Sequence, residues 1–202
     1  MSEEWEQREY TGENFSGQDF SDCVFRQCRF TKCRFAFAVL SGCTTQQCRF
    51  EECDFSGTRL NDTTHEHTSF ANSTFGEANL FVATFAECQM IGADFFKADF
   101  GGITIQGGDW SYSNLRQQDL HKQDLQHVNF TDADFSGCNL EKADLRYADL
   151  TRAVLSQTRL KGANLVGAEL SGIHFEELDL HGVIIDRLQA IVIAKRLGAI
   201  VK

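Results

Sequence analysis

The chain has 202 residues, with 29 acidic and 19 basic side chains and a formal net charge of −10 at pH 7. This charge argues against direct binding to nucleic acid, because DNA binding requires a basic surface. No apolar run is long enough to cross a membrane and the acidic N-terminus is unlike a signal peptide, so we expect a cytoplasmic protein without membrane contact.

A five-residue period runs through most of the chain. From Trp5 to Ile185, every residue whose number is a multiple of five is large and apolar, except Thr45 and His65. The residue two positions earlier is usually small, the preceding residue is often Asp or Asn, and glycine often follows two positions later. Glycine accepts positive φ and therefore marks a turn. The period fits neither a helix nor an ordinary strand.

We interpret each five-residue unit as one side of a square coil, so that four units, or twenty residues, complete a turn. The large central residue would point to the axis, the small residue would fill the space beside it, and the other positions would face water. Successive coils would stack as parallel strands about 4.8 Å apart. This predicts one elongated all-β domain over residues 1–185.

The units are similar to a known repeat, roughly Ala-(Asp/Asn)-Leu-x-x. The best matches are Ala133-Asp134-Phe135, Ala143-Asp144-Leu145, Ala148-Asp149-Leu150 and Ala163-Asn164-Leu165. The chain thereby resembles the pentapeptide-repeat proteins. The resemblance implies a right-handed quadrilateral parallel β-helix.

All eight cysteines occupy the small inward position, where cysteine can replace alanine as a small buried group. Pairs such as Cys23 and Cys43 lie one predicted coil apart, within reach of a disulfide but poorly aimed for one. We therefore expect free thiols and no metal centre.

Three further features interrupt the pattern. Thr45 and His65 would stack in consecutive coils as an irregular core notch, either closed by a hydrogen bond between them or open to a partner as a bulge at residues 61–67. Residues 101–108 contain two glycine pairs and Ile103 in the small position, which predicts a kink or a second bulge. Outward apolar residues form a candidate partner contact or local corner packing: Phe81, Val82, Ile91 and Phe96.

Residues 186–202 follow a different pattern. Asp186 is a candidate N-cap, and a helix is predicted from Arg187 to Leu197, ending at Gly198. Gln189 and Arg196 are expected to face water. The helix would cap the last coil, either as a simple cap or also as a two-fold dimer interface formed by Leu188, Ile191, Val192, Ile193 and Leu197.

The ending Arg196-Leu197-Gly198-Ala199-Ile200-Val201 resembles that of the Qnr and MfpA group. This resemblance implies a homodimer that mimics DNA, binds bacterial DNA gyrase and protects it from fluoroquinolones. No insertion breaks the period, so the chain is similar to the loopless MfpA type. The sequence has no phosphate-binding loop or nucleophile elbow, so we expect no enzymatic activity and no cofactor. The alternative function is a non-catalytic scaffold for another protein.

Overall fold

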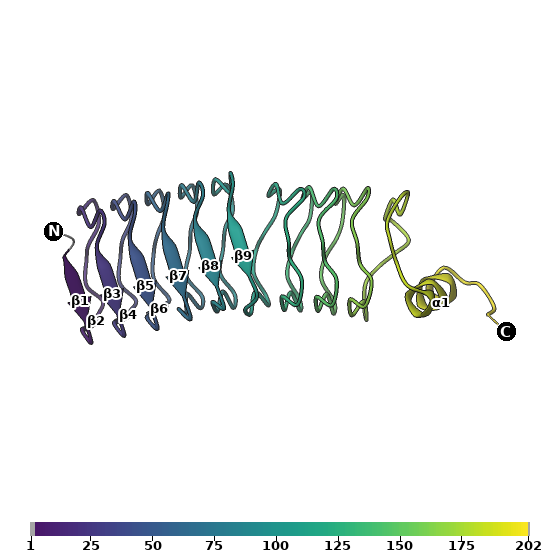
Figure 1. Cartoon of the computed structure of the whole chain (residues 1–202), viewed down its shortest axis with the longest axis horizontal. Helices are drawn as coiled ribbons and strands as arrows, with labels where there is room; N and C mark the ends of the chain where they lie inside the picture. Colours follow the sequence, from purple (N-terminus) through teal and green to yellow (C-terminus); the bar gives the residue numbers. More distant parts are fainter. Residues whose placement is uncertain (1–2, 202) are drawn as a thin grey trace.

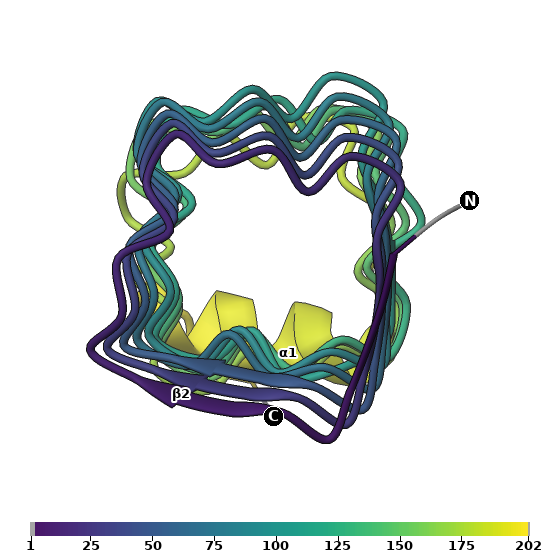
Figure 2. The same ribbon diagram turned by 90° about the vertical axis from the view of Figure 1, so that its left-hand side faces the viewer.

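A computed structural model describes residues 3–201, which form an elongated parallel β-helix that ends in a single helix (Figure 1). Viewed along its length, the backbone follows four sides around the core (Figure 2). Each coil pairs in parallel with the next at a register of twenty residues, as in the pairs Trp5–Phe25 and Phe30–Phe50. The predicted fold class is confirmed: the quadrilateral parallel β-helix follows the five-residue period.

We number the four sides by their first central residue: Trp5 for the first, Tyr10 for the second, Phe15 for the third and Phe20 for the fourth. The first side carries a six-stranded sheet of β1 (Glu4–Glu6), β3 (Val24–Arg26), β5 (Thr44–Gln46), β7 (Thr64–Glu66), β8 (Thr84–Ala86) and β9 (Thr104–Gln106). The second side carries β2 (Glu9–Thr11), β4 (Arg29–Thr31) and β6 (Arg49–Glu51). Elsewhere the coils pair through isolated parallel bridges, such as Asn14 with Arg34.

The corners are left-handed turns at the position two residues after the centre. At one of them, the Gln18 amide donates to the Phe15 carbonyl (3.1 Å) and Gly17 has a φ of 69°. This geometry is a type II turn, in which the third residue favours glycine. Larger residues adopt it too, including Phe37 (φ 59°) and Val82 (φ 53°). The turn is therefore imposed by the coil and not only by glycine.

The core is a stack of central side chains. Along the second side, the ring of Phe50 stacks on those of Phe30 (4.8 Å between centroids) and Phe70 (5.1 Å). The small inward position is also mostly buried, and several of its polar members donate to a carbonyl of the preceding coil. Thr58 Oγ1 donates to the Phe35 oxygen (2.8 Å), and Cys138 Sγ donates to the Leu115 oxygen (2.7 Å).

All eight cysteines are free and buried in this position. Burial raises the pKa of the Cys43 and Cys53 thiols to about 12. Because the thiolate is the reactive form, these cysteines are chemically inert packing groups.

Neither candidate bulge is a loop. Residues 61–67 contain β7, and the His67 amide donates to the Ala86 carbonyl (2.9 Å). Residues 101–108 pair regularly with the preceding coil, where the Thr104 amide donates to the Ala83 carbonyl (2.8 Å). The irregularity predicted for this segment lies between it and the following coil.

Candidate protein-interaction surfaces

The predicted notch at Thr45 and His65 is a closed polar cluster inside the core. Both residues are buried, and Thr45 Oγ1 lies 2.8 Å from His65 Nδ1. His65 Nε2 lies 3.0 Å from Thr63 Oγ1, which donates to the Leu60 carbonyl oxygen (2.7 Å). The imidazole also stacks on the Phe85 ring, with centroids 4.7 Å apart. The hydrogen bond expected between Thr45 and His65 is present.

One tautomer satisfies both ring nitrogens of His65. With its proton on Nε2, His65 donates to Thr63 and accepts the Thr45 hydroxyl proton at Nδ1. Burial lowers the pKa of His65 to about 3, so the ring is neutral at physiological pH. A neutral, fully bonded and buried pair offers no surface to a partner.

The exposed apolar residues do not form one patch. Phe81 and Val82 lie on the fourth side and its corner, and they cover Gly101 and Gly102 of the next coil. A Cβ atom at Gly102 would approach Val82 Cγ1 to 2.9 Å, so the glycine makes room for the valine. Phe81 and Val82 therefore pack locally at the corner, which was the predicted alternative to a partner contact, although both remain partly exposed.

The other two members of the predicted patch lie elsewhere. Phe96 belongs to the third side, where it lines a shallow depression with Arg116, Gln117 and Ser136. Ile91 belongs to the second side and is only partly exposed. The four residues thus occupy three sides of the solenoid.

The C-terminal helix α1 (Arg187–Arg196) is tied to the last coil by its N-terminus. Asp186 Oδ1 accepts from the amides of Leu188 (2.8 Å) and Gln189 (2.9 Å), and its other oxygen accepts from the Gly167 amide (3.0 Å). These donors lower the pKa of Asp186 and complete the predicted N-cap.

Gln189 is buried, and the prediction that it faces water is wrong. Its Nε2 donates to the carbonyl oxygens of Leu165 (2.6 Å) and Ala168 (2.8 Å), and its Oε1 accepts from the Asp186 amide (2.9 Å). The Leu165 carbonyl also accepts the Ala168 amide (2.9 Å), but the Ala168 carbonyl has no following coil to supply its donor, so the glutamine side chain replaces this missing backbone donor. An amide is therefore more useful at this position than an apolar side chain.

The predicted dimer residues divide into two groups. Ile193 is 6% exposed and packs with the core, so its assignment to the dimer interface is wrong. Four others are exposed: Leu188 (75%), Ile191 (38%), Val192 (44%) and Leu197 (54%). Leu188, Ile191 and Val192 have the spacing of one helical stripe. This stripe runs beside the docked face, and its Leu188 and Val192 line a depression with Ala168 and Leu170 of the last coil.

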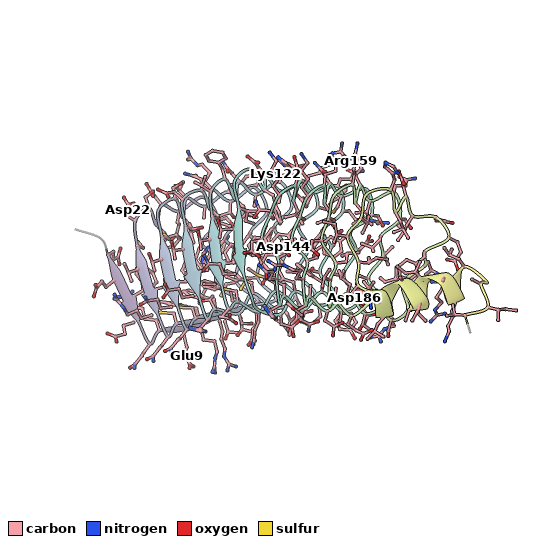
Figure 3. All side chains as sticks on the ribbon, turned by 45° about the vertical axis from the view of Figure 1, so that its right-hand side comes forward. Glu9, Asp22, Lys122, Asp144, Arg159 and Asp186 are labelled. Carbon is pink, nitrogen blue, oxygen red and sulfur yellow. The ribbon has the colours of Figure 1, made fainter. Side chains whose placement is uncertain are left out.

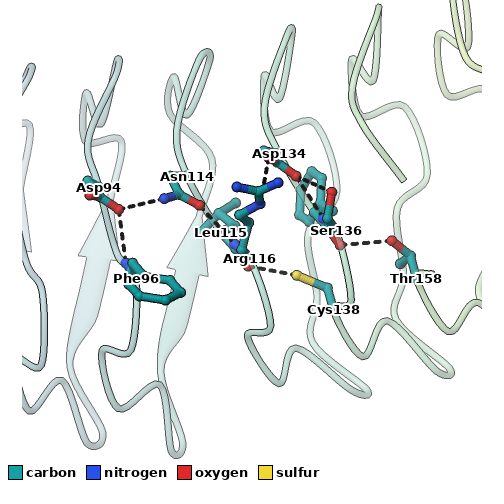
Figure 4. Close-up of polar contacts among 10 residues, drawn as sticks. Asp94, Phe96, Asn114, Leu115, Arg116, Asp134, Ser136, Cys138 and Thr158 are labelled. Carbon is teal, nitrogen blue, oxygen red and sulfur yellow. Dashed lines mark hydrogen bonds and ion pairs between the residues drawn. The ribbon is translucent and has the colours of Figure 1, made fainter. Parts of the chain in front are cut away.

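The outer carboxylates are largely committed to the fold. The Asp or Asn before the central residue accepts the amide two residues later, as Asp94 does from Phe96 and Asp134 from Ser136 (Figure 4). Asn114 Nδ2 then donates to Asp94 Oδ1 in the coil below (2.7 Å). Arg116 pairs with Asp134 in the coil above (3.0 Å).

Charged side chains project from all sides of the rod (Figure 3). Residues 1–100 contain 16 acids and 8 bases (8 − 16 = −8), whereas residues 101–202 contain 13 acids and 11 bases (11 − 13 = −2). The negative charge is therefore concentrated in the N-terminal half. No group of three or more potential metal ligands occurs among residues 3–201, and no helix within this range could span a membrane.

Comparison with known families agrees with this geometry. A model of a pentapeptide repeat region matches residues 4–80, and a model of eight pentapeptide repeats matches residues 98–137, 138–176 and 153–187. The chain belongs to the pentapeptide-repeat family. A sequence comparison with curated proteins finds no match.

Among solved structures, this pentapeptide-repeat protein is similar to full-length QnrB1, a plasmid-mediated fluoroquinolone resistance protein. The TM-score is 0.86 at 23% sequence identity, over 97% of this chain and 100% of QnrB1. A trypsin-treated QnrB1 variant gives a TM-score of 0.86 at 24% identity, over 98% and 100% of the two chains. The likeness establishes a shared fold along the whole rod.

Proposed function

We propose that this pentapeptide-repeat protein binds bacterial DNA gyrase and protects it from fluoroquinolones, as a DNA-mimicking homodimer without chemistry of its own. The main support is the full-length match to QnrB1, whose described role is fluoroquinolone resistance. The C-terminal resemblance to the Qnr and MfpA group adds the expectation of gyrase as the partner.

The homodimer is supported by the exposed stripe of α1. Leu188, Ile191 and Val192 are exposed beside the face that Gln189 and Ile193 dock on the last coil. An apolar stripe on a terminal helix is favourable only when another surface covers it. A two-fold axis at this end would join two rods into one longer rod.

The acidic surface supports partial mimicry of DNA. Duplex DNA carries about one negative charge per 1.7 Å of its length, far more than this rod with its net charge of −10. Shape would therefore contribute more than charge, and binding would favour the more acidic N-terminal half.

A gyrase supercoiling assay with ciprofloxacin tests the proposal. Titration of the protein should restore supercoiling that the drug has inhibited, and Leu188→Asp should weaken this rescue. Inhibition of supercoiling without rescue would indicate simple competition with DNA. Absence of any effect at tens of micromolar would contradict the proposed function.

The second candidate is a non-catalytic scaffold for another protein. It is favoured by the commitment of Asp94, Asp134 and their equivalents to backbone hydrogen bonds, because these carboxylates are held close to the surface instead of projecting like phosphates. Failure of the gyrase assay together with a stable dimer would favour this alternative.

A further inference from the structure

The backbone ladder opens once in the middle of the rod, after β9 on the first and fourth sides. The carbonyl partners that the regular register provides are missing there. Seven amides lack them: those of Lys97, at the corner before the fourth side, and of Phe100, Gly102, Ile105, Gly107, Asp119 and Asp124. On the other two sides of the same coil the ladder is closed, as between the Trp110 amide and the Asn129 carbonyl (2.7 Å).

The neighbouring coils provide an internal comparison. In the coil before the opening, the Leu80 amide donates to the Asp99 carbonyl (2.9 Å) and Val82 donates to Gly101 (2.8 Å). In the coil after it, the Leu120 amide donates to the Asn139 carbonyl (2.9 Å). The opening is therefore local, and it leaves two facing rows of unpaired backbone groups.

Large residues in the small inward position explain the opening. Ile103 and Gln123 are twenty residues apart and stack directly on the first side, where most other coils have Ala, Cys or Thr. Gln118 occupies the equivalent position on the fourth side, above Ala98. The same relation recurs near the C-terminus, where Ile173 and Leu178 occupy this position and the bridges to the preceding coil are also missing.

The opening after β9 is a surface cleft of about 410 Å³ and not a gap in the core. Ile103 and Leu125 remain buried beneath it. The cleft is lined by Thr104, Gln106, Gln126 and His127, together with two carboxylates, Glu87 and Asp124. Neither carboxylate forms an ion pair among the described residues.

We propose that this cleft binds an extended peptide segment carrying a lysine or arginine. Two facing rows of unpaired amides and carbonyls match the alternating hydrogen-bond groups of a β-strand, which is how sheet edges capture peptides. Glu87 and Asp124 select a cation on that segment. The site is independent of the dimer stripe and goes beyond the proposed role on gyrase.

A model peptide tests the site. We expect Ac-Thr-Val-Lys-Val-Thr-amide, at millimolar concentration, to slow hydrogen exchange of the Ile105, Gly107 and Asp124 amides, which line the cleft, at least tenfold. The exchange of Leu80, Val82 and Leu120, whose amides are already paired, should not change. The analogue with glutamate in place of lysine should bind at least tenfold more weakly.

Two variants separate the site from non-specific binding. Ile103→Ala combined with Gln123→Ala restores small residues, should close the ladder and should abolish peptide protection. Asp124 lies on the surface, so Asp124→Lys should not unfold the chain. This variant should bind the glutamate peptide more tightly than the lysine peptide. Amides that are already protected in the free protein, or equal protection by both peptides, would overturn the proposal.

Discussion

His65 is a histidine held neutral at a position that phenylalanine or leucine fills in most other coils. Its two ring nitrogens are satisfied by Thr45 and Thr63, so the buried polar groups are compensated by hydrogen bonds. The two polar residues that interrupt the apolar period, Thr45 and His65, are therefore accommodated in the core by hydrogen bonds. The main physical consequence is a dependence of stability on pH.

We predict that the free energy of unfolding falls as the pH falls below about 6.5. The native pKa of His65 is about 3, whereas an unfolded histidine titrates near 6.5, so the unfolded state binds a proton that the native state excludes. The contribution is about 1.4 kcal/mol per pH unit within this window. His65→Phe should reduce the slope by that amount in urea unfolding at pH 6.5, 5.5 and 4.5. Equal slopes for the two proteins would contradict a neutral buried imidazole.

At the scale of the element, α1 shows how a solenoid end is closed. Its buried face uses Ile193 for apolar packing and Gln189 for the carbonyls of Leu165 and Ala168. The neighbouring face keeps Leu188, Ile191 and Val192 exposed. One short helix therefore has separable roles in capping and in the proposed dimerisation.

Gln189→Ala should destabilise the protein by about 2 kcal/mol, because it removes a capping box and leaves the Ala168 carbonyl without a donor. Thermal or urea unfolding measures the loss. Lys195→Ala, on an exposed position of the same helix, is the matched control and should change stability by less than about 0.5 kcal/mol. A Gln189→Ala protein as stable as the control would exclude the proposed cap.

Leu188→Asp should convert the dimer to a monomer in light scattering, because it places a charge in the proposed apolar interface. Ala190→Asp tests the same charge away from the exposed stripe and should remain dimeric. Ile193→Asp should instead unfold the C-terminal coil, since Ile193 packs with the core. A wild-type monomer would refute the dimer.

At the scale of the whole molecule, the net charge is uneven along the rod, −8 over residues 1–100 and −2 over residues 101–202. The proposed binding to gyrase predicts an association rate that falls about tenfold between low and physiological salt, through loss of electrostatic steering. Glu13→Lys with Glu77→Lys, in the acidic half, should lower this rate more than Glu176→Lys with Glu177→Lys. Stopped-flow kinetics would show the difference, and equal rates would place the contact elsewhere.

The amino-acid sequence alone determined the coil, its register and the start and capping of the helix, because each follows from a local pattern repeated every five residues or from a capping signal. Only the tertiary structure decided two other features: the burial of Gln189 and the opening of the ladder beside Ile103 and Gln123. These features depend on which groups meet across coils or at the end of the stack. Gln189 is buried because a carbonyl at the end of the stack needs a donor, and the ladder opens because two large side chains stack on each other. Neither effect can be seen from the hydrophobicity of a single residue. For the opening, the large residues in the small position were visible in the sequence, but their effect required knowing that the side chains stack directly on one another.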